Sequence, residues 1–317
     1  MNQNQKYENR NKHIDNLISK YINNDSFNII HFLVLILVNL IIINLLIFLI
    51  KKKFSKFKQI INYNYNYITK FSIVYTFIYS CIVLIGFVYL DKTRSSEFWD
   101  NWGGPIVQIS NTSNEPSKDG TFLLRKWNAH SSLALFGSGV FIILKTYELK
   151  TIIPKFIDKY LISYVLGILL VLLGFASYGW WGSKRYILWR ADHALIEGVN
   201  LYLILIILNS SGIFNINQKK IILVSLFIWF IRIFYMGQAN FLYSFIFCIM
   251  SILFSIIYSK SIGNIYLLKS GILLAVSSIV FKVADISNKL SSGTGLFHIF
   301  ISLGIILLWL WSLTLSK

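Results

Sequence analysis

The chain has 317 residues, of which 56% are hydrophobic, and its formal net charge at pH 7 is +17. A mean hydropathy of +0.62 and apolar runs of about 20 residues, the length that crosses a bilayer core, exclude a soluble domain and indicate a polytopic membrane protein. The excess lysine and arginine lies mostly in short segments beside these runs, where it sets orientation, so it does not indicate nucleic-acid binding.

The predicted elements begin with a polar N-terminal tail at 1–26, and nine apolar spans follow it. These spans are predicted at 27–50, 71–90, 128–147, 160–181, 186–208, 220–237, 239–259, 265–284 and 295–315. A polar loop at 91–127 separates the first two spans from the other seven. We therefore predict an all-α membrane helical bundle, with an N-terminal two-helix transmembrane hairpin at 27–90 and a seven-helix core at 128–317.

Charge asymmetry orients the predicted spans. The linker at 51–70 contains lysines but no acidic residue, which places it in the cytosol, and the loop at 91–127 then lies outside or in a lumen. The triplet Asn111-Thr112-Ser113 is a glycosylation acceptor on that outer side. We expect an integral multi-pass protein of an endomembrane, such as the ER or Golgi, or of the plasma membrane.

The fifth predicted span contains Arg190, Asp192, His193 and Glu197 within eight residues. A charge at the centre of a bilayer costs about 2.5–3.5 kcal/mol on insertion scales, so such side chains need a partner or a wet cavity. Arg190, His193 and Glu197 share one helical face and could form a structural ion network. Asp192 points elsewhere and needs a partner from another helix.

Polar residues of other spans fall at the same depth. Asp192 is about six residues into its span, roughly 9 Å from the outer side at 1.5 Å per residue. Polar residues at the outer ends of the third, fourth and ninth spans are Asn128, His130, Ser131, Ser132, Ser177 and His298. This common level predicts a polar cavity that opens toward the outer side of the bundle.

Two smaller patterns concern packing. The sequence Gly137-Ser138-Gly139 predicts close approach of two helices, because small residues let helix backbones come together. Lys282 is three residues from Asp285 and is therefore its neighbour on a helix, so we expect Lys282 to pair or to reach toward the membrane surface.

Four stretches resemble motifs of a superfamily of seven-helix membrane hydrolases, which groups the alkaline ceramidases with the progestin and adipoQ receptors. The stretches are "WNAHSS" at 127–132, "GFASYGWW" at 174–181, "WRADHALIEG" at 189–198 and "GTGLFHIFISLGIILLW" at 293–309. The resemblance covers residues 120–315 and implies a bundle of seven helices. It also implies that Asn128 and Ser131 belong to the first motif.

The resemblance implies a chemistry as well. Alkaline ceramidases hydrolyse the amide of a ceramide with a zinc ion held by three histidines. His298 matches one of these histidines, and Ser177 and Asp192 match the serine and aspartate that help to orient water and substrate. A membrane lipid, and in particular a sphingolipid, is the partner that follows from this resemblance.

The chain departs from the family pattern at four positions. Trp181 and Thr294 stand where two zinc-binding histidines are usual, Ser132 replaces an asparagine, and Arg125 replaces a glutamate. Tryptophan cannot ligate zinc and threonine is a poor ligand, whereas a catalytic site needs three protein ligands. Without the metal, no group lowers the pKa of water to about 7. We therefore expect a lipid-binding relative that is catalytically impaired, in which Trp181 fills the space of the lost metal.

Three alternatives remain open from the sequence. His130, His193 and His298 could form a relocated zinc site for lipid amide hydrolysis, with Glu197 or Asp192 beside it. Each of these histidines could instead satisfy a local hydrogen bond. Arg190, Asp192 and Glu197 could also line the path of a small-solute or proton transporter, but that path would require polar groups in both halves of the membrane.

Overall fold

The computed structural model describes residues 65–102, 113–117, 119–152, 157–212, 220, 222–223, 225–227, 241–258 and 262–315. Within these residues the chain is almost entirely helical, and β structure is limited to isolated bridges such as that between Ser95 and Thr121. The predicted tail at 1–26, the predicted first span at 27–50 and the acceptor Asn111 lie outside the described residues.

The helices follow one another along the chain with short connections. The described α-helices are α3 (Tyr65–Thr93), α4 (Lys126–Ile152), α5 (Ile157–Ser183), α6 (Tyr186–Ser210), α8 (Phe241–Tyr258), α9 (Ile265–Ile286) and α10 (Gly293–Thr314). A 3₁₀-helix, η2 (Ser96–Trp102), follows α3. The predicted span 239–259 corresponds to α8, whereas most of the predicted span 220–237 lies outside the described residues.

Six described helices are long and apolar enough to cross a membrane. These segments are Ser72–Thr93, Lys126–Leu149, Tyr160–Ser183, Tyr186–Ser210, Ile265–Ile286 and Gly293–Thr314. Each satisfies the backbone polar groups within the helix, as a membrane-spanning segment must. The chain is therefore a multi-pass helical membrane protein.

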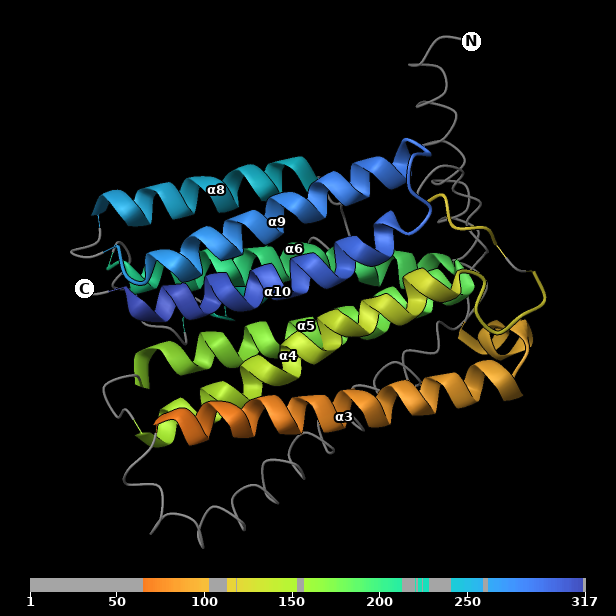
Figure 1. Cartoon of the computed structure of the whole chain (residues 1–317), viewed down its shortest axis with the longest axis horizontal. Coiled ribbons are helices and arrows are strands. Elements are labelled where there is room, and N and C mark those ends of the chain that lie inside the picture. The colour runs from red at the N-terminus through yellow and green to blue at the C-terminus, as the bar shows by residue number, and fades with distance from the viewer. Residues whose placement is uncertain are drawn as a thin grey trace, which may run out of the picture.

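The helices pack in a bundle in which successive helices from α3 to α6, and α9 and α10, run antiparallel (Figure 1). Helix α4 packs against α5 and α10, α5 packs against α6, and α9 packs against α10, while α3 lies on the outer side of α4 and α8 contacts α6 (Figure 1). Helices α3, α5 and α9 finish at the same end at which α4, α6 and α10 begin (Figure 1). We call this end of the bundle the loop end, because it carries the segment between α3 and α4.

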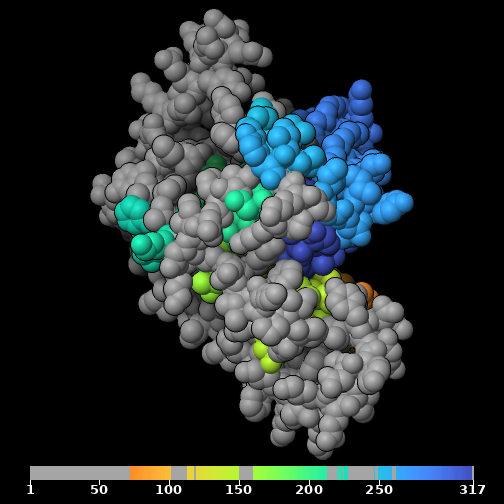
Figure 2. All heavy atoms as spheres, turned by 90° about the vertical axis from the view of Figure 1, so that its left-hand side faces the viewer, coloured from red at the N-terminus to blue at the C-terminus, as the bar shows by residue number. Residues whose placement is uncertain are grey.

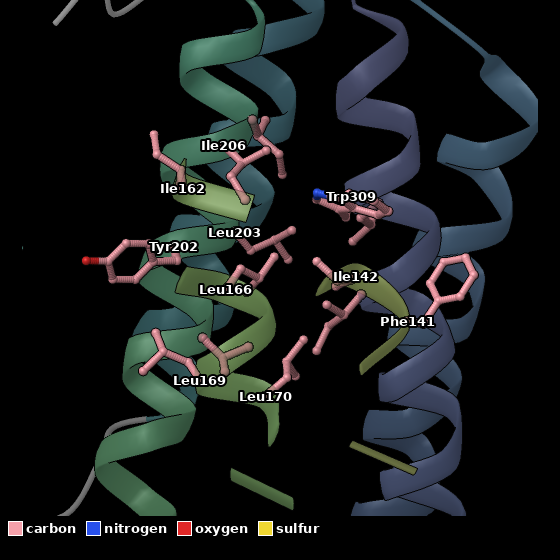
Figure 3. Close-up of a cluster of buried hydrophobic side chains, with 14 of the residues drawn as sticks. Phe141, Ile142, Ile162, Leu166, Leu169, Leu170, Tyr202, Leu203, Ile206 and Trp309 are labelled. Carbon is pink, nitrogen blue, oxygen red and sulfur yellow. The ribbon is translucent and has the colours of Figure 1, made fainter. Parts of the chain in front are cut away.

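An apolar core fills the middle of the bundle. In Figure 3, Ile142 from α4, Leu166 from α5 and Leu203 from α6 point toward a shared space. Trp309 of α10 joins them, and its indole N–H donates to the hydroxyl of Ser163, 3.0 Å away. This core keeps α4, α5, α6 and α10 in fixed relation and so fixes the side chains at the loop end above it.

The outward faces carry apolar side chains. Only 6% of the residues in the apolar window of α3 and 17% of those in the window of α9 are buried. The exposed residues of these helices include Phe77, Ile85 and Leu273. Figure 2 views the end opposite the loop end, where coloured atoms of α8, α9 and α10 gather on one side. Exposed apolar faces of this kind suit contact with lipid tails.

Close approach of α4 and α5 confirms the prediction from Gly137-Ser138-Gly139. A Cβ on Gly139 would lie 2.5 Å from the carbonyl oxygen of Gly167, which is backbone and cannot move aside. We expect Gly139→Ala to lower the free energy of unfolding by about 1–3 kcal/mol, seen as a lower thermal midpoint in detergent. The matched control is Gly86→Ala on α3, where a Cβ meets nothing within 4 Å. Equal midpoints for the two variants would contradict this packing.

Candidate functional site

The segment between α3 and α4 closes the loop end of the bundle. Trp99 of η2 is buried, and its indole N–H donates to the carbonyl oxygen of Phe122 at 2.6 Å. The amide of Leu124 donates to the carbonyl of Gly182, and that of Arg125 donates to the carbonyl of Trp181. The predicted outer loop is therefore packed on the end of α5 where it is described.

Polar side chains from α4, α5, α6, α9 and α10 meet beneath this segment. We call them the loop-end cluster, which comprises Ser131, Ser177, Asp192, Lys282, Asp285, Thr294 and His298. All of them are buried except Lys282, which is partly buried. The sequence predicts that polar groups gather at one level, and of the residues named for that level this cluster contains Ser131, Ser177, Asp192 and His298, all of which are buried.

The first contact in the cluster joins α4 to α10. The hydroxyl of Ser131 lies 3.0 Å from Nδ1 of His298 and donates to the carbonyl of Asn128, also at 3.0 Å. The side-chain amide of Asn128 donates to the hydroxyl of Ser113 at 2.8 Å. Two motif residues that are 167 positions apart are thus brought together.

The second contact joins α5 to α6. Ser177 is a side-chain hydrogen-bond partner of Asp192, and the charge of Lys282 from α9 acts on the same carboxyl. This meets the expectation that Asp192 takes a partner from another helix. Ser177 and Asp192, which the sequence analysis singled out together, are therefore adjacent in space.

The third contact joins α9 to α10. The ammonium of Lys282 donates to Oγ1 of Thr294 at 2.7 Å, and the same hydroxyl donates to Oδ2 of Asp285. Oδ2 of Asp285 also accepts from the amide of Thr294, while Oδ1 accepts from the amide of Asn114. Asp285 therefore fixes the start of α10 and the segment before α4 at once.

Two cations lie near the ring of Trp181. The ammonium of Lys282 is 5.1 Å from the centroid of the Trp181 ring, and the guanidinium carbon of Arg125 is 5.6 Å from it. Both separations fall within the range of a cation–π interaction. The ring of Trp181 also lies 6.3 Å from that of His298. Trp181 is buried, in keeping with the expectation that it fills space.

The three histidines of the relocated zinc hypothesis have separate neighbours. Nδ1 of His193 lies 3.0 Å from the backbone oxygen of Trp189, and the ring of His130 lies against Tyr178. His298 instead contacts Ser131. In the described parts of the chain, no three His, Cys, Asp or Glu side chains are close enough to hold a metal ion. The relocated triad is therefore not assembled in this structure.

Arg190, His193 and Glu197, for which the sequence predicts an ion network, contact residues of their own helix. The guanidinium of Arg190 donates to the hydroxyl of Tyr186 at 3.1 Å. Nδ1 of His193 lies 3.9 Å from Oδ2 of Asp192, and the charge of Glu197 acts on His193. These residues lie beside the cluster and connect to it through Asp192.

One residue that the sequence analysis missed shapes the start of α4. Glu115 accepts from the amides of Trp127 at 2.7 Å and Asn128 at 2.9 Å, which are orphan donors of the first helical turn. Burial raises the pKa of the Glu115 carboxyl above its ordinary value, while these hydrogen bonds and the charge of Arg125 act in the opposite direction. An acidic residue 11 positions before α4 gives no sequence signal for capping.

A solvent-open hollow of about 450 Å³ lies beyond the cluster at the turn from α5 to α6. Residues lining it include Asp100, Asp119, Lys184 and Arg185, and Arg185 forms an ion pair with Asp100. None of the described residues that line it belongs to the loop-end cluster. This hollow is therefore separate from the loop-end cluster, and it is not the polar cavity that the sequence predicts at the level of Asp192 and His298.

The donor set does not fit a zinc ion at the positions that the family motifs indicate. The indole nitrogen of Trp181 carries a proton and only donates. The hydroxyl of Thr294 is already engaged by Lys282 and Asp285. The chain matches no known protein-family model, and it shows no significant sequence similarity to a curated protein.

Proposed function

We propose that this multi-pass membrane protein binds a lipid of the ceramide type at the loop-end cluster and does not hydrolyse it by a zinc mechanism. The proposal combines the resemblance to alkaline ceramidases with the mismatch at Trp181 and Thr294. Ser131, Ser177, Asp192 and His298, which match family motifs, lie together in one buried cluster.

The observation that carries this proposal is a set of buried polar atoms near the cluster. Oδ1 of Asp192, Oδ1 of Asn128 and Nε1 of Trp181 have no hydrogen-bond partner among the described residues. A buried polar group left unpaired costs about 1–3 kcal/mol. The head of a ceramide offers an amide N–H and two hydroxyls to the two acceptors and a carbonyl oxygen to the indole N–H. The polar groups of such a lipid therefore complement those of the site.

A transporter is the second function considered, and a buried ion pair favours it. Lys145 and Glu148 of α4 lie 3.4 Å apart and are almost fully buried, far along the helix from the cluster. The α4 residues between the two polar groups, including Leu135, Phe136 and Ile142, are apolar except for Ser138, whose hydroxyl donates to the carbonyl of Leu135 in the same helix. They leave no continuous polar path along α4, so lipid binding remains the better supported function.

Photo-crosslinking tests the lipid proposal. The purified full chain in phosphatidylcholine nanodiscs is irradiated with a photoactivatable ceramide, and competition with unlabelled ceramide or diacylglycerol is measured. We expect saturable labelling that ceramide displaces and diacylglycerol, which lacks the amide, displaces poorly. Asp192→Ala should weaken binding about tenfold or more, the effect of a lost hydrogen bond to a charged group, while Asn200→Ala on the same helix should not. Labelling that no competitor displaces would refute the proposal.

Hydrolysis is measured on the same samples. We expect no release of fatty acid from fluorescent ceramide above that of empty nanodiscs, with or without added zinc. Release that is lost in His298→Ala would instead establish the amide hydrolase.

A further inference from the structure

Three of the four residues that depart from the family pattern belong to one connected group. Arg125 lies over the ring of Trp181, and Lys282 lies over the same ring and donates to Thr294. The loss of two zinc ligands therefore coincides with the approach of two basic side chains. The inference below rests on the proposed function, because it takes positions 181, 294 and 298 as those of the former zinc ligands.

The ammonium of Lys282 lies among those three positions. Its Nζ atom is 2.7 Å from Oγ1 of Thr294 and 5.1 Å from the ring centroid of Trp181, and its charge acts on His298. We propose that the ammonium of Lys282 occupies the place of the metal ion, as a cation tethered to α9.

The charges around Lys282 explain why a cation is needed there. The carboxyls of Asp192 and Asp285 are buried, and the charges of both act on Lys282. A buried carboxylate without a counter-charge is strongly unfavourable. An ammonium is a compact point charge with three donors and no acceptor, so it meets this need. It cannot act as a Lewis acid or deliver a metal-bound hydroxide, which separates the charge balance of the site from hydrolysis.

The ammonium of Lys282 should prevent a zinc ion from binding at positions 181, 294 and 298 even when all three are histidines. Histidines at positions 181 and 294 would supply two imidazoles beside His298, which is the ligand number of a catalytic zinc site. The ammonium of Lys282 would still lie among them and repel a second cation. Zinc binding should therefore require the removal of Lys282 in addition to the two histidine substitutions.

The experiment compares variants of the full chain purified in detergent. Zinc per chain is measured by elemental analysis after equilibrium dialysis, and cobalt(II) absorption reports tetrahedral coordination. We expect no bound zinc in the wild type or in Trp181→His/Thr294→His. We expect one zinc per chain in Trp181→His/Thr294→His/Lys282→Ala. Its zinc affinity should be about 10–100-fold higher than that of the double variant, which is the scale on which a residue next to the ligands changes metal affinity.

A matched variant shows whether the position of Lys282 matters or only the loss of one positive charge from α9. Adding Lys269→Ala to the double variant removes an exposed lysine from the same helix and should not create zinc binding. Equal zinc affinity of the double and triple variants would overturn the proposal, as would a folded triple variant that binds no zinc. If the triple variant with Lys282→Ala does not fold, Lys282→Ser takes the place of Lys282→Ala. Zinc must then raise the thermal midpoint of that triple variant.

Ceramide crosslinking of the wild type is measured in parallel. If ceramide crosslinking is retained but the double and triple variants do not differ in zinc binding as expected, only the proposal for Lys282 is overturned. If the two variants differ in zinc binding as expected but ceramide crosslinking fails, only the proposal of lipid binding is overturned.

Discussion

Lys282→Ala is expected to destabilise the protein by about 3–5 kcal/mol, the cost of removing one partner from a buried charge group. The substitution removes a cation whose charge acts on the carboxyls of Asp192 and Asp285, and it removes the donor to Thr294. Arg125 still acts on Asp285. Stability is measured as the fraction folded against temperature in detergent, by size-exclusion chromatography of the heated samples.

A compensating substitution tests the electrostatic origin of this loss. Lys282→Ala/Asp192→Asn should recover part of the stability, because the uncompensated carboxylate is then absent. Lys269→Ala, which removes an exposed lysine from α9, should leave the midpoint unchanged. If Lys282→Ala and Lys269→Ala behave alike, Lys282 does not interact with the buried carboxyls.

Asp285→Ala is expected to release two segments at once. The carboxyl accepts the amide of Asn114 at 2.7 Å, the amide of Thr294 at 3.0 Å and the hydroxyl of Thr294. Each hydrogen bond to a charged group contributes about 1.5–3 kcal/mol. Hydrogen exchange should therefore increase both at the start of α10 and around residues 113–117, while the middle of α4 stays protected.

Asp119→Ala serves as the control for this measurement, because Asp119 is exposed in the same loop. It should leave exchange at the start of α10 unchanged. Faster exchange at only one of the two segments in Asp285→Ala would contradict the bridging role of Asp285.

Much of this architecture could be predicted from the sequence. Apolar runs of membrane length gave the positions of α3, α4, α5, α6, α9 and α10, because hydropathy alone determines such spans. The common depth of Ser131, Ser177, Asp192 and His298 followed from the direction of each span and the rise per residue. The structure confirms that these residues meet.

The role of Lys282 could not be predicted. Its spacing from Asp285 indicated a pair within one helix, yet its ammonium donates to Thr294 of the next helix. Which neighbour a long side chain reaches depends on how α9 packs on α10, and helix spacing within one element does not encode that. The contact of Arg125 with Trp181 depends on tertiary packing in the same way, because Arg125 precedes α4 and Trp181 lies near the end of α5.

The relocated zinc triad was suggested because its histidines share one depth. Depth does not determine direction around a helix, and the structure gives His130, His193 and His298 separate neighbours. Depth also does not show what covers a cluster, and here the residues just before α4 bond to the end of α5.

The most direct test of the account is whether the motif residues of α4 and α10 meet at the loop end. Ser131→Cys/His298→Cys is made with Cys81 and Cys248 changed to serine. Crosslinking of the two new cysteines by a short bifunctional thiol reagent is measured by mass spectrometry of the digested protein. Oγ of Ser131 lies 3.0 Å from Nδ1 of His298, so a short linker that takes the place of the imidazole should join the two sulfurs within one chain. The control pair Ser131→Cys/Ser312→Cys, whose second cysteine lies roughly 21 Å further along α10 at 1.5 Å per residue, should not be joined. If the first pair is not crosslinked, or if both pairs are crosslinked alike, the loop-end cluster does not exist as described.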